Sequence, residues 1–90
     1  MNILVDRVFE KDIGKIRSKK ILSELKQVII FIERAQSIHE IRNSKNIEGY
    51  SQYYRIKISE YRLGLEKVSS NEVKLIRFLH RKEVYRYFPR

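Results

Sequence analysis

The 90-residue chain contains no cysteine, which excludes a disulfide framework, a thiol nucleophile and a zinc site built on cysteine. It has two histidines and no motif of paired acidic residues, so we expect neither a bound metal nor a cofactor. Its longest apolar run, Val28–Ile32, is far shorter than the roughly 20 residues of a membrane span. The N-terminus lacks the pattern of a signal peptide. We therefore expect a cytoplasmic protein that does not enter a membrane.

Acidic residues are also scarce relative to basic ones. The chain has 20 Lys and Arg against 11 Asp and Glu, a formal net charge of +9. Most of this excess lies after residue 44, in the second half of the chain. Such a balance favours a phosphate-rich or acidic partner. Ninety residues suffice for one modest hydrophobic core, so we treat residues 1–90 as a single domain.

The first half of the chain predicts a strand followed by two helices. Asn2–Val5 is short and apolar, as expected of a first strand. Asp6 and Ser18 are suitable N-cap residues for two helices joined by a short connection, which makes them an antiparallel hairpin. Apolar residues recur at helical spacing in both helices: Phe9, Ile13 and Ile16 in the first, and Ile21, Leu22, Leu25, Val28, Ile29 and Ile32 in the second.

A polar segment separates the helices from the strands that follow. Ser37–Glu40 fits the capping box Ser-x-x-Glu and predicts a brief helix over Ile38–Asn43. Asn43–Gly49 is polar and ends in glycine, which predicts a loop.

Three antiparallel strands are predicted in the last third of the chain. Tyr53–Ile58 and Tyr61–Val68 alternate apolar and polar residues on either side of the two-residue turn Ser59-Glu60. Val73–Leu79 also alternates, although apolar residues occur on both of its faces. The whole pattern predicts an α+β fold of two layers: an antiparallel sheet of about four strands, with the N-terminal helix hairpin on one face and the other face open.

The predicted hairpin gathers positive charge on its open face. A two-residue turn places Lys57 directly opposite Arg62, and Arg55 opposite Gly64. Like charges paired across strands repel, so folding alone gives no reason for the arrangement, and we interpret it as a site for a polyanion. The segment His80–Pro89 adds further cations, an imidazole and two phenols at the end of the last strand.

The ordered set of elements, with Tyr54–Ile58, Tyr61–Gly64 and Phe78–Arg86, resembles the RelE/ParE toxin superfamily, in its RelE branch. The resemblance spans essentially the whole chain. It implies a RelE-like fold and the toxin of a type II toxin–antitoxin system, a ribosome-dependent endoribonuclease that cleaves mRNA without a metal and so inhibits translation. It also implies a cognate antitoxin partner, in a complex that binds operator DNA through the antitoxin.

The resemblance further implies which residues act. Arg55 and Lys57 match the two basic residues of the first hairpin strand, Arg62 matches the arginine of the second, and Arg81 matches the arginine at the end of the last strand. Tyr85 is the best match for the tyrosine that follows. Alternative acids or RNA-binding residues remain nearby: His80, Lys82, Arg86 and Tyr87.

These residue types suit RNA cleavage, which requires loss of the ribose 2′-OH proton, stabilisation of the phosphate charge and protonation of the departing 5′ oxygen. Arg62 and Arg81 can bind phosphate oxygens bidentately. Lys57 is our hypothesis for the base, since neighbouring cations disfavour a further positive charge. Tyr85 or His80 would act as the acid, or Tyr85 would stack on a nucleobase.

Two other functions are compatible with the sequence. One is a DNA gyrase poison of the ParE type, although that branch generally lacks the full basic and aromatic set. The other is a non-enzymatic nucleic-acid-binding module that acts with an antitoxin. Individual residues also have structural interpretations: Arg55 and Lys57 as the solvated side of a strand, and Phe88 as a hydrophobic clasp onto the sheet.

Overall fold

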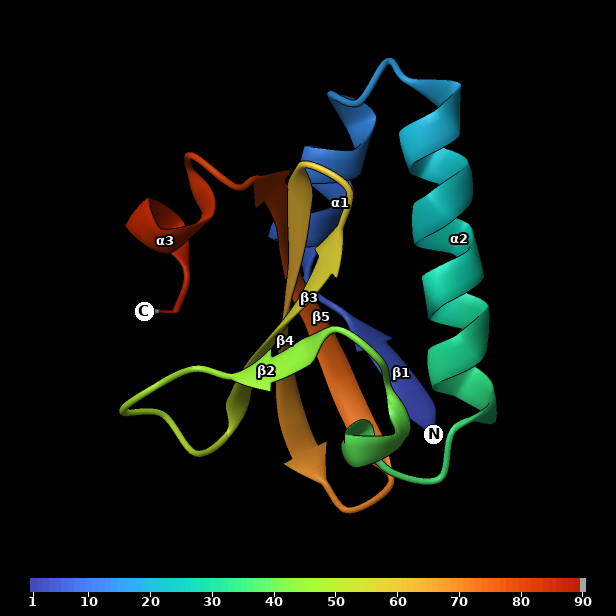
Figure 1. The fold of residues 1–90 in the computed structure, drawn as a ribbon, viewed down its shortest axis with the longest axis vertical. Coiled ribbons are helices and arrows are strands. Elements are labelled where there is room, and N and C mark those ends of the chain that lie inside the picture. The colour runs from blue at the N-terminus through green and yellow to red at the C-terminus, as the bar shows by residue number, and fades with distance from the viewer. Residues whose placement is uncertain (90) are drawn as a thin grey trace.

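One five-stranded sheet organises the computed structural model, which describes residues 1–89 (Figure 1). From one edge to the other, the strands are β1 (Asn2–Val5), β5 (Glu72–His80), β4 (Tyr61–Ser69), β3 (Tyr53–Ile58) and β2 (Ser44–Asn46). The chain begins beside its last strand, since β1 pairs with β5 in parallel. All other pairs are antiparallel.

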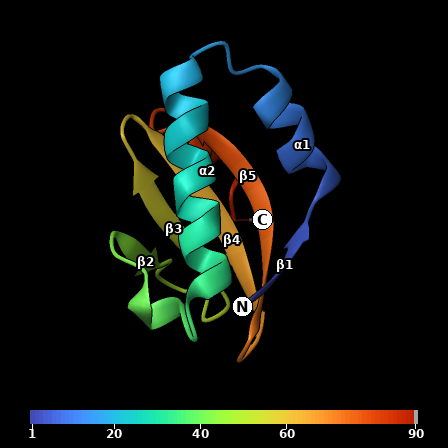
Figure 2. The same cartoon turned by 90° about the vertical axis from the view of Figure 1, so that its right-hand side faces the viewer.

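The two predicted N-terminal helices are present, and both begin at the predicted caps. The Asp6 carboxylate accepts a hydrogen bond from the Val8 N–H at 2.8 Å and starts α1 (Arg7–Gly14). The Ser18 hydroxyl accepts from the Ile21 N–H at 3.2 Å and starts α2 (Lys19–Arg34). Seen from the side, α2 crosses in front of the sheet while α1 lies beside β5 (Figure 2). None of the helices within residues 1–89 has the length and apolar character that crossing a membrane requires.

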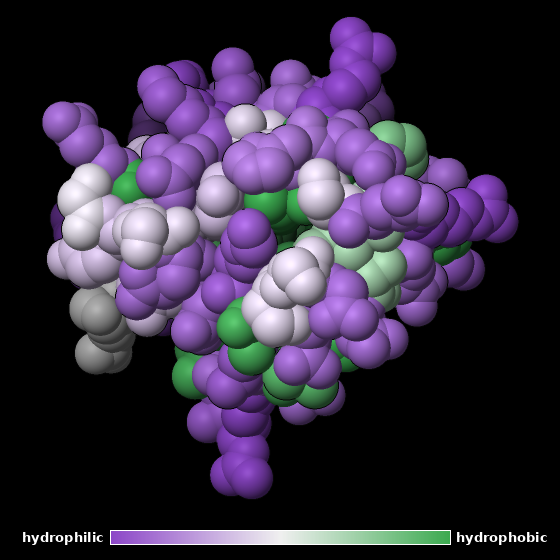
Figure 3. Space-filling view, turned by 90° about the horizontal axis from the view of Figure 1, so that it is seen from below, coloured by the Kyte–Doolittle hydropathy of each residue, from purple (hydrophilic) through white to green (hydrophobic). Residues whose placement is uncertain are grey.

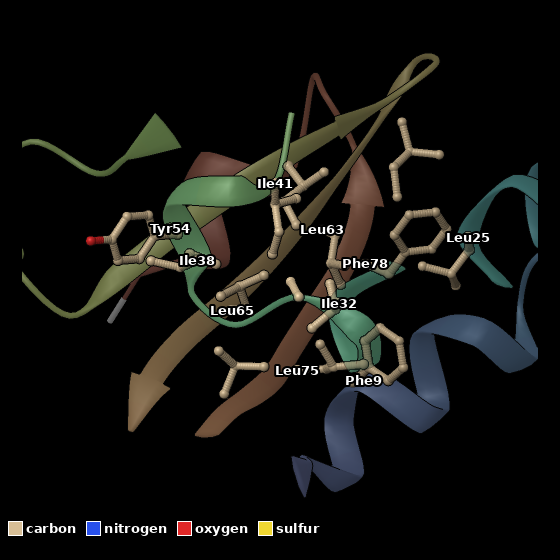
Figure 4. Packing of buried hydrophobic residues seen from close by; sticks show 14 residues of the cluster. Phe9, Leu25, Ile32, Ile38, Ile41, Tyr54, Leu63, Leu65, Leu75 and Phe78 are labelled. Carbon is tan, nitrogen blue, oxygen red and sulfur yellow. The ribbon is translucent and has the colours of Figure 1, made fainter. Parts of the chain in front are cut away.

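The core lies between these two helices and one face of the sheet (Figure 4). Phe9 from α1 and Leu25 and Ile32 from α2 are buried against it. The sheet contributes the side chains that alternation predicts for β3 and β4: Tyr54, Ile56, Ile58, Leu63 and Leu65. The predicted α+β architecture and the helix-covered face are therefore confirmed.

A β-bulge in β5 explains why apolar residues occur on both of its faces. Gly64 pairs with Arg77 but Leu65 pairs with Leu75, so Ile76 is an extra residue. The bulge changes the phase of the strand: Leu75 faces the core before it and Phe78 faces the core after it. Arg77 is thereby placed opposite Gly64, on the other face of the sheet.

The sequence-based prediction was wrong about the middle of the chain and about the number of strands. Only Ile38–Glu40 is helical, as a single 3-10 turn. Part of the predicted loop, Ser44–Asn46, forms β2 on the edge of the sheet next to β3. The sheet therefore has five strands where about four were predicted.

The second face of the sheet is not fully open, contrary to the prediction. A short helix, α3 (Val84–Tyr87), lies on the side of the sheet opposite α2 (Figure 1). Val84 and Phe88 are buried on either side of its exposed turn. Phe88 occupies the space above Gly64: a Cβ built there would lie 2.7–2.9 Å from three carbons of the Phe88 ring. The interpretation of Phe88 as a hydrophobic clasp is confirmed.

Gly64→Ala tests this contact. The added methyl group overlaps the Phe88 ring, so we expect the C-terminal segment to shift and the free energy of unfolding to fall by about 1–3 kcal/mol. Urea denaturation measures the change. Gly14→Ala is the control, because its Cβ would have no neighbour within 4 Å, and it should raise stability by about 0.4–1 kcal/mol. Equal stability of Gly64→Ala and the parent chain would contradict the proposed packing.

Candidate functional site

Strands β3 and β4 present three cations on the sheet face away from α2. The register is the predicted one: Lys57 pairs with Arg62, and Arg55 pairs with Gly64. The turn between the strands is the predicted Ser59-Glu60, with Ser59 in the left-handed region at a φ of 55°. We call Arg55, Lys57 and Arg62 the basic face.

No carboxylate neutralises the basic face among residues 1–89, whose ion pairs all involve other cations. The Arg62 guanidinium instead donates through Nη1 to the carbonyl oxygens of Ser59 and Tyr61, at 3.1 and 2.9 Å. These bonds fix the side chain along its own turn. Arg55 Nη1 donates to the Asn43 carbonyl at 3.4 Å. The positive charge is therefore held in place and left available to an external anion.

Arg81 is brought to the same turn from the end of β5. Its backbone N–H donates to the Glu60 carbonyl at 2.8 Å, and its Nε lies 2.8 Å from Glu60 Oε1. Both side chains of this pair are more than half exposed, so the pair contributes little to stability. The pair instead affects the geometry of the site, because Arg62 of β4 and Arg81, which directly follows β5, are both bonded to the Ser59-Glu60 turn.

Tyr85 and Arg55 line one hollow, of about 220 Å³, between α3 and the segment that contains β2. The remaining lining residues are Lys45, Asn46, Ile47 and Glu48. Tyr85 is 56% exposed, so its phenol is accessible to a ligand. The structure therefore brings the predicted tyrosine close to one end of the basic face.

The alternative residues are placed differently. His80 pairs with Tyr61 across the strands and meets its ring edge to face, with the ring centroids 5.6 Å apart, and Tyr61 in turn stacks on the buried Phe78. These contacts place His80 on the helix-covered side of the sheet, away from the basic face. Lys82 and Arg86 are exposed, and the Lys82 N–H donates to His80 Nδ1 at 3.1 Å.

The sequence-based reasoning missed a buried ion pair. Asp12, only 4% exposed, accepts from Arg77 Nε at 2.9 Å, from Arg77 Nη2 at 3.0 Å and from the Phe78 backbone N–H at 2.9 Å. The hydrogen bonds to this carboxylate raise the pKa of Arg77 above its usual value, so the guanidinium stays charged. The available signal was a carboxylate between Phe9 and Ile16, on the apolar face of α1.

Hydrophilic side chains cover most of the surface at the end of the molecule where β4 and β5 turn, and apolar atoms show in a shallow hollow (Figure 3).

Within residues 1–89, no group of three or more His, Asp or Glu side chains is arranged to hold a metal ion. The chemically active groups of the site are guanidinium, ammonium and phenol. They can bind phosphate and transfer protons.

Comparison with known proteins decides the family. Toxin RelE3 of Methanocaldococcus jannaschii is 34% identical over 90 residues, which cover 99% of this chain and 100% of the relative. The chain belongs to the RelE family of toxins. No protein-family model matches it.

Solved structures agree with a RelE-like fold. A chain of the RelB–RelE antitoxin–toxin complex from Methanococcus jannaschii is 34% identical and superimposes with a TM-score of 0.79, covering 96% of this chain and 99% of that one. A mutant of E. coli toxin RelE, bound to an antitoxin RelB peptide, is 21% identical and has a TM-score of 0.70, covering 99% and 94%. The second likeness concerns the fold alone.

Asp12→Ala tests how much the buried ion pair contributes to stability. The substitution leaves the partly buried Arg77 guanidinium and the Phe78 N–H without their acceptor, so we expect a loss of about 3–5 kcal/mol in the free energy of unfolding. Urea denaturation measures it, and Glu10→Ala, on the exposed side of α1, should cost less than about 0.5 kcal/mol. Similar losses in both variants would show that the pair is not important for stability.

Proposed function

We propose that this RelE-family chain is the toxin of a toxin–antitoxin pair and that it cleaves mRNA bound to the ribosome. The observation that carries the proposal is the gathering of four cations on and beside the β3–β4 hairpin. Arg55, Lys57 and Arg62 share a sheet face, no carboxylate of residues 1–89 pairs with them, and Arg81 is bonded to the adjoining turn. Membership of the RelE family supports the same activity.

The proposed reaction begins with attack of a ribose 2′-OH on the adjacent phosphorus. The base removes the 2′-OH proton, the new O2′–P bond forms and the P–O5′ bond breaks. The acid then protonates the departing 5′ oxygen, which leaves a 2′,3′-cyclic phosphate and a 5′-OH. Charge accumulates on the non-bridging phosphate oxygens, where fixed cations stabilise the transition state most.

Arg62 and Arg81 are the proposed phosphate ligands. The Ser59-Glu60 turn fixes both, so little reorganisation is required when the phosphate charge develops. In Arg81, Glu60 occupies Nε and leaves the two terminal nitrogens for phosphate oxygens. One such donor typically contributes a factor of about 10²–10³ to the rate.

Lys57 is the proposed base and Tyr85 the proposed acid. Lys57 is directly opposite Arg62, whereas Tyr85 lies with Arg55 in the neighbouring hollow. Arg55 and Lys57 are two residues apart on one strand, which separates their Cα atoms by about 7 Å. In this proposal the base and the acid lie on different sides of the phosphate, as displacement of the 5′ oxygen by the 2′ oxygen requires.

A cognate antitoxin is the proposed protein partner. The related archaeal protein was solved as a RelB–RelE complex, and the E. coli protein was solved with a RelB peptide. The net charge of +9 favours an acidic partner here too. We further propose that the complex binds operator DNA through the antitoxin.

Cleavage of a defined mRNA during translation tests the proposal. Purified protein is added to programmed ribosomes, and new RNA ends are mapped by primer extension. We expect cuts at decoding-site codons, reduced by about 10²–10³ in Arg62→Ala and in Arg81→Ala because each loses one phosphate ligand. Lys20→Ala, which removes the same charge from the exposed start of α2, should cleave like the parent chain.

A ribosome-free reaction distinguishes dependence on the ribosome from general nuclease activity. If the folded protein produces no cuts on ribosomes, the proposed nuclease activity is contradicted. The gyrase poison and the non-enzymatic binding module are then favoured. For a pure binder, Arg62→Ala should weaken nucleic-acid affinity and reduce its salt dependence, without any turnover to lose.

Lys57→Arg separates the charge of this residue from its role as a base. Arginine keeps the positive charge but does not release its proton near neutral pH. We expect the single-turnover cleavage rate to fall by about 10²–10⁴ and the rise of the rate with pH, which reports deprotonation of the base, to be lost. An unchanged rate and pH profile would reject Lys57 as the base.

A further inference from the structure

Tyr87, which the sequence left as an alternative to Tyr85, faces a different part of the molecule. Its ring lies over the Arg77 guanidinium, with Cζ 5.3 Å from the ring centroid. It lines a hollow of about 330 Å³ that includes Arg77, Lys74, Glu66 and Phe88. Neither Arg55 nor Tyr85 lines that hollow, whereas Tyr85 and Arg55 share the other one.

The Arg77 guanidinium is a rigid support for this ring. Asp12 holds it through two hydrogen bonds from the edge of the guanidinium, at 2.9 and 3.0 Å. Bidentate geometry fixes the plane of the group, which leaves its face for the aromatic ring. A cation–π contact with an immobilised guanidinium is stronger than one with a freely moving side chain, because less entropy is lost in forming it.

Helix α3, which carries Tyr85 and Tyr87, depends on tertiary contacts for its position. With four residues, α3 is far too short to be stable in isolation. Its position depends on Val84 and Phe88, which are buried, and on the contact of Tyr87 with Arg77. Tyr85 is part of the same turn, so any displacement of α3 also displaces its phenol.

We propose that Tyr87 is a positioning residue, whose ring holds α3 on the Arg77 guanidinium and thereby sets the place of Tyr85 beside Arg55. The effect of Tyr87 on cleavage rests on the proposed function, in which Tyr85 is the acid. The aromatic ring matters and the hydroxyl does not, since the ring makes the contact with Arg77. Asp12 contributes indirectly, by fixing the guanidinium on which the ring lies.

Three substitutions test the proposal. Tyr87→Phe keeps the ring and removes the hydroxyl, Tyr87→Leu removes the ring, and Tyr85→Phe removes the proposed acid. We expect Tyr87→Phe to cleave within about twofold of the parent chain. Tyr87→Leu should lower kcat by on the order of tenfold with little change in KM, since the cations that bind the phosphate are untouched. Tyr85→Phe should lose about 10²–10⁴ in kcat.

Two readouts are independent of cleavage. Hydrogen exchange follows the Phe88 amide, which donates to the Val84 carbonyl at 2.8 Å and reports opening of α3. Fluorotyrosine incorporated at position 85 reports the surroundings of that phenol by its ¹⁹F shift. Tyr87→Leu should speed exchange on the order of tenfold and move the ¹⁹F signal, whereas Tyr87→Phe should change neither.

Each outcome decides the inference. Loss of cleavage in Tyr87→Phe equal to that in Tyr85→Phe would overturn it and make the Tyr87 hydroxyl a chemical participant. Unchanged exchange and ¹⁹F signal in Tyr87→Leu would also overturn it. If the parent chain does not cleave mRNA, the proposed function fails, but the exchange and ¹⁹F results still decide whether Tyr87 positions α3 and Tyr85.

Discussion

The buried carboxylate of Asp12 connects the helix layer of the molecule to the sheet. It receives two hydrogen bonds from Arg77 and one from the Phe78 backbone, and so ties α1 to β5 beyond the point where β1 ends. Arg77 then supports Tyr87 on the other face of the sheet. A charge buried so deeply is tolerated only with complete hydrogen bonding, which explains why three donors converge on it.

The turn between β3 and β4 joins the residues of the candidate site, as Asp12 joins α1 to β5. It sets the register that places Lys57 opposite Arg62, and it accepts hydrogen bonds from Arg62 and Arg81. Glu60 pairs with Arg81 and does not neutralise the basic face. The turn therefore brings two guanidinium groups together, as electrostatic stabilisation of a transition state requires.

Strong local signals predicted much of this arrangement from the sequence. The caps at Asp6 and Ser18 and the two-residue turn at Ser59-Glu60 are determined by side chains close in sequence, and all three are confirmed. Because the register of a hairpin follows from its turn, the facing positions of Lys57 and Arg62 were predictable as well.

The rest depends on contacts between distant parts of the chain. Strand β2 has three polar residues and no alternation, so only its pairing with β3 reveals it. The bulge at Ile76 moves Arg77 to the face opposite the core, and no local pattern specifies that change. Helix α3 depends on contacts with the distant sheet, among them Phe88 above Gly64, and the different surroundings of Tyr85 and Tyr87 follow from that packing.

The most direct test of the account is a structure of the protein on a ribosome whose decoding-site codon carries 2′-O-methyl groups, which block the proposed attack. The proposed mechanism predicts that the scissile phosphate contacts Arg62 and Arg81, with Lys57 near the methylated 2′ oxygen and Tyr85 near the 5′ oxygen. A complex in which the mRNA contacts α2 or the α1–α2 connection, with the basic face turned away from the RNA, would contradict it.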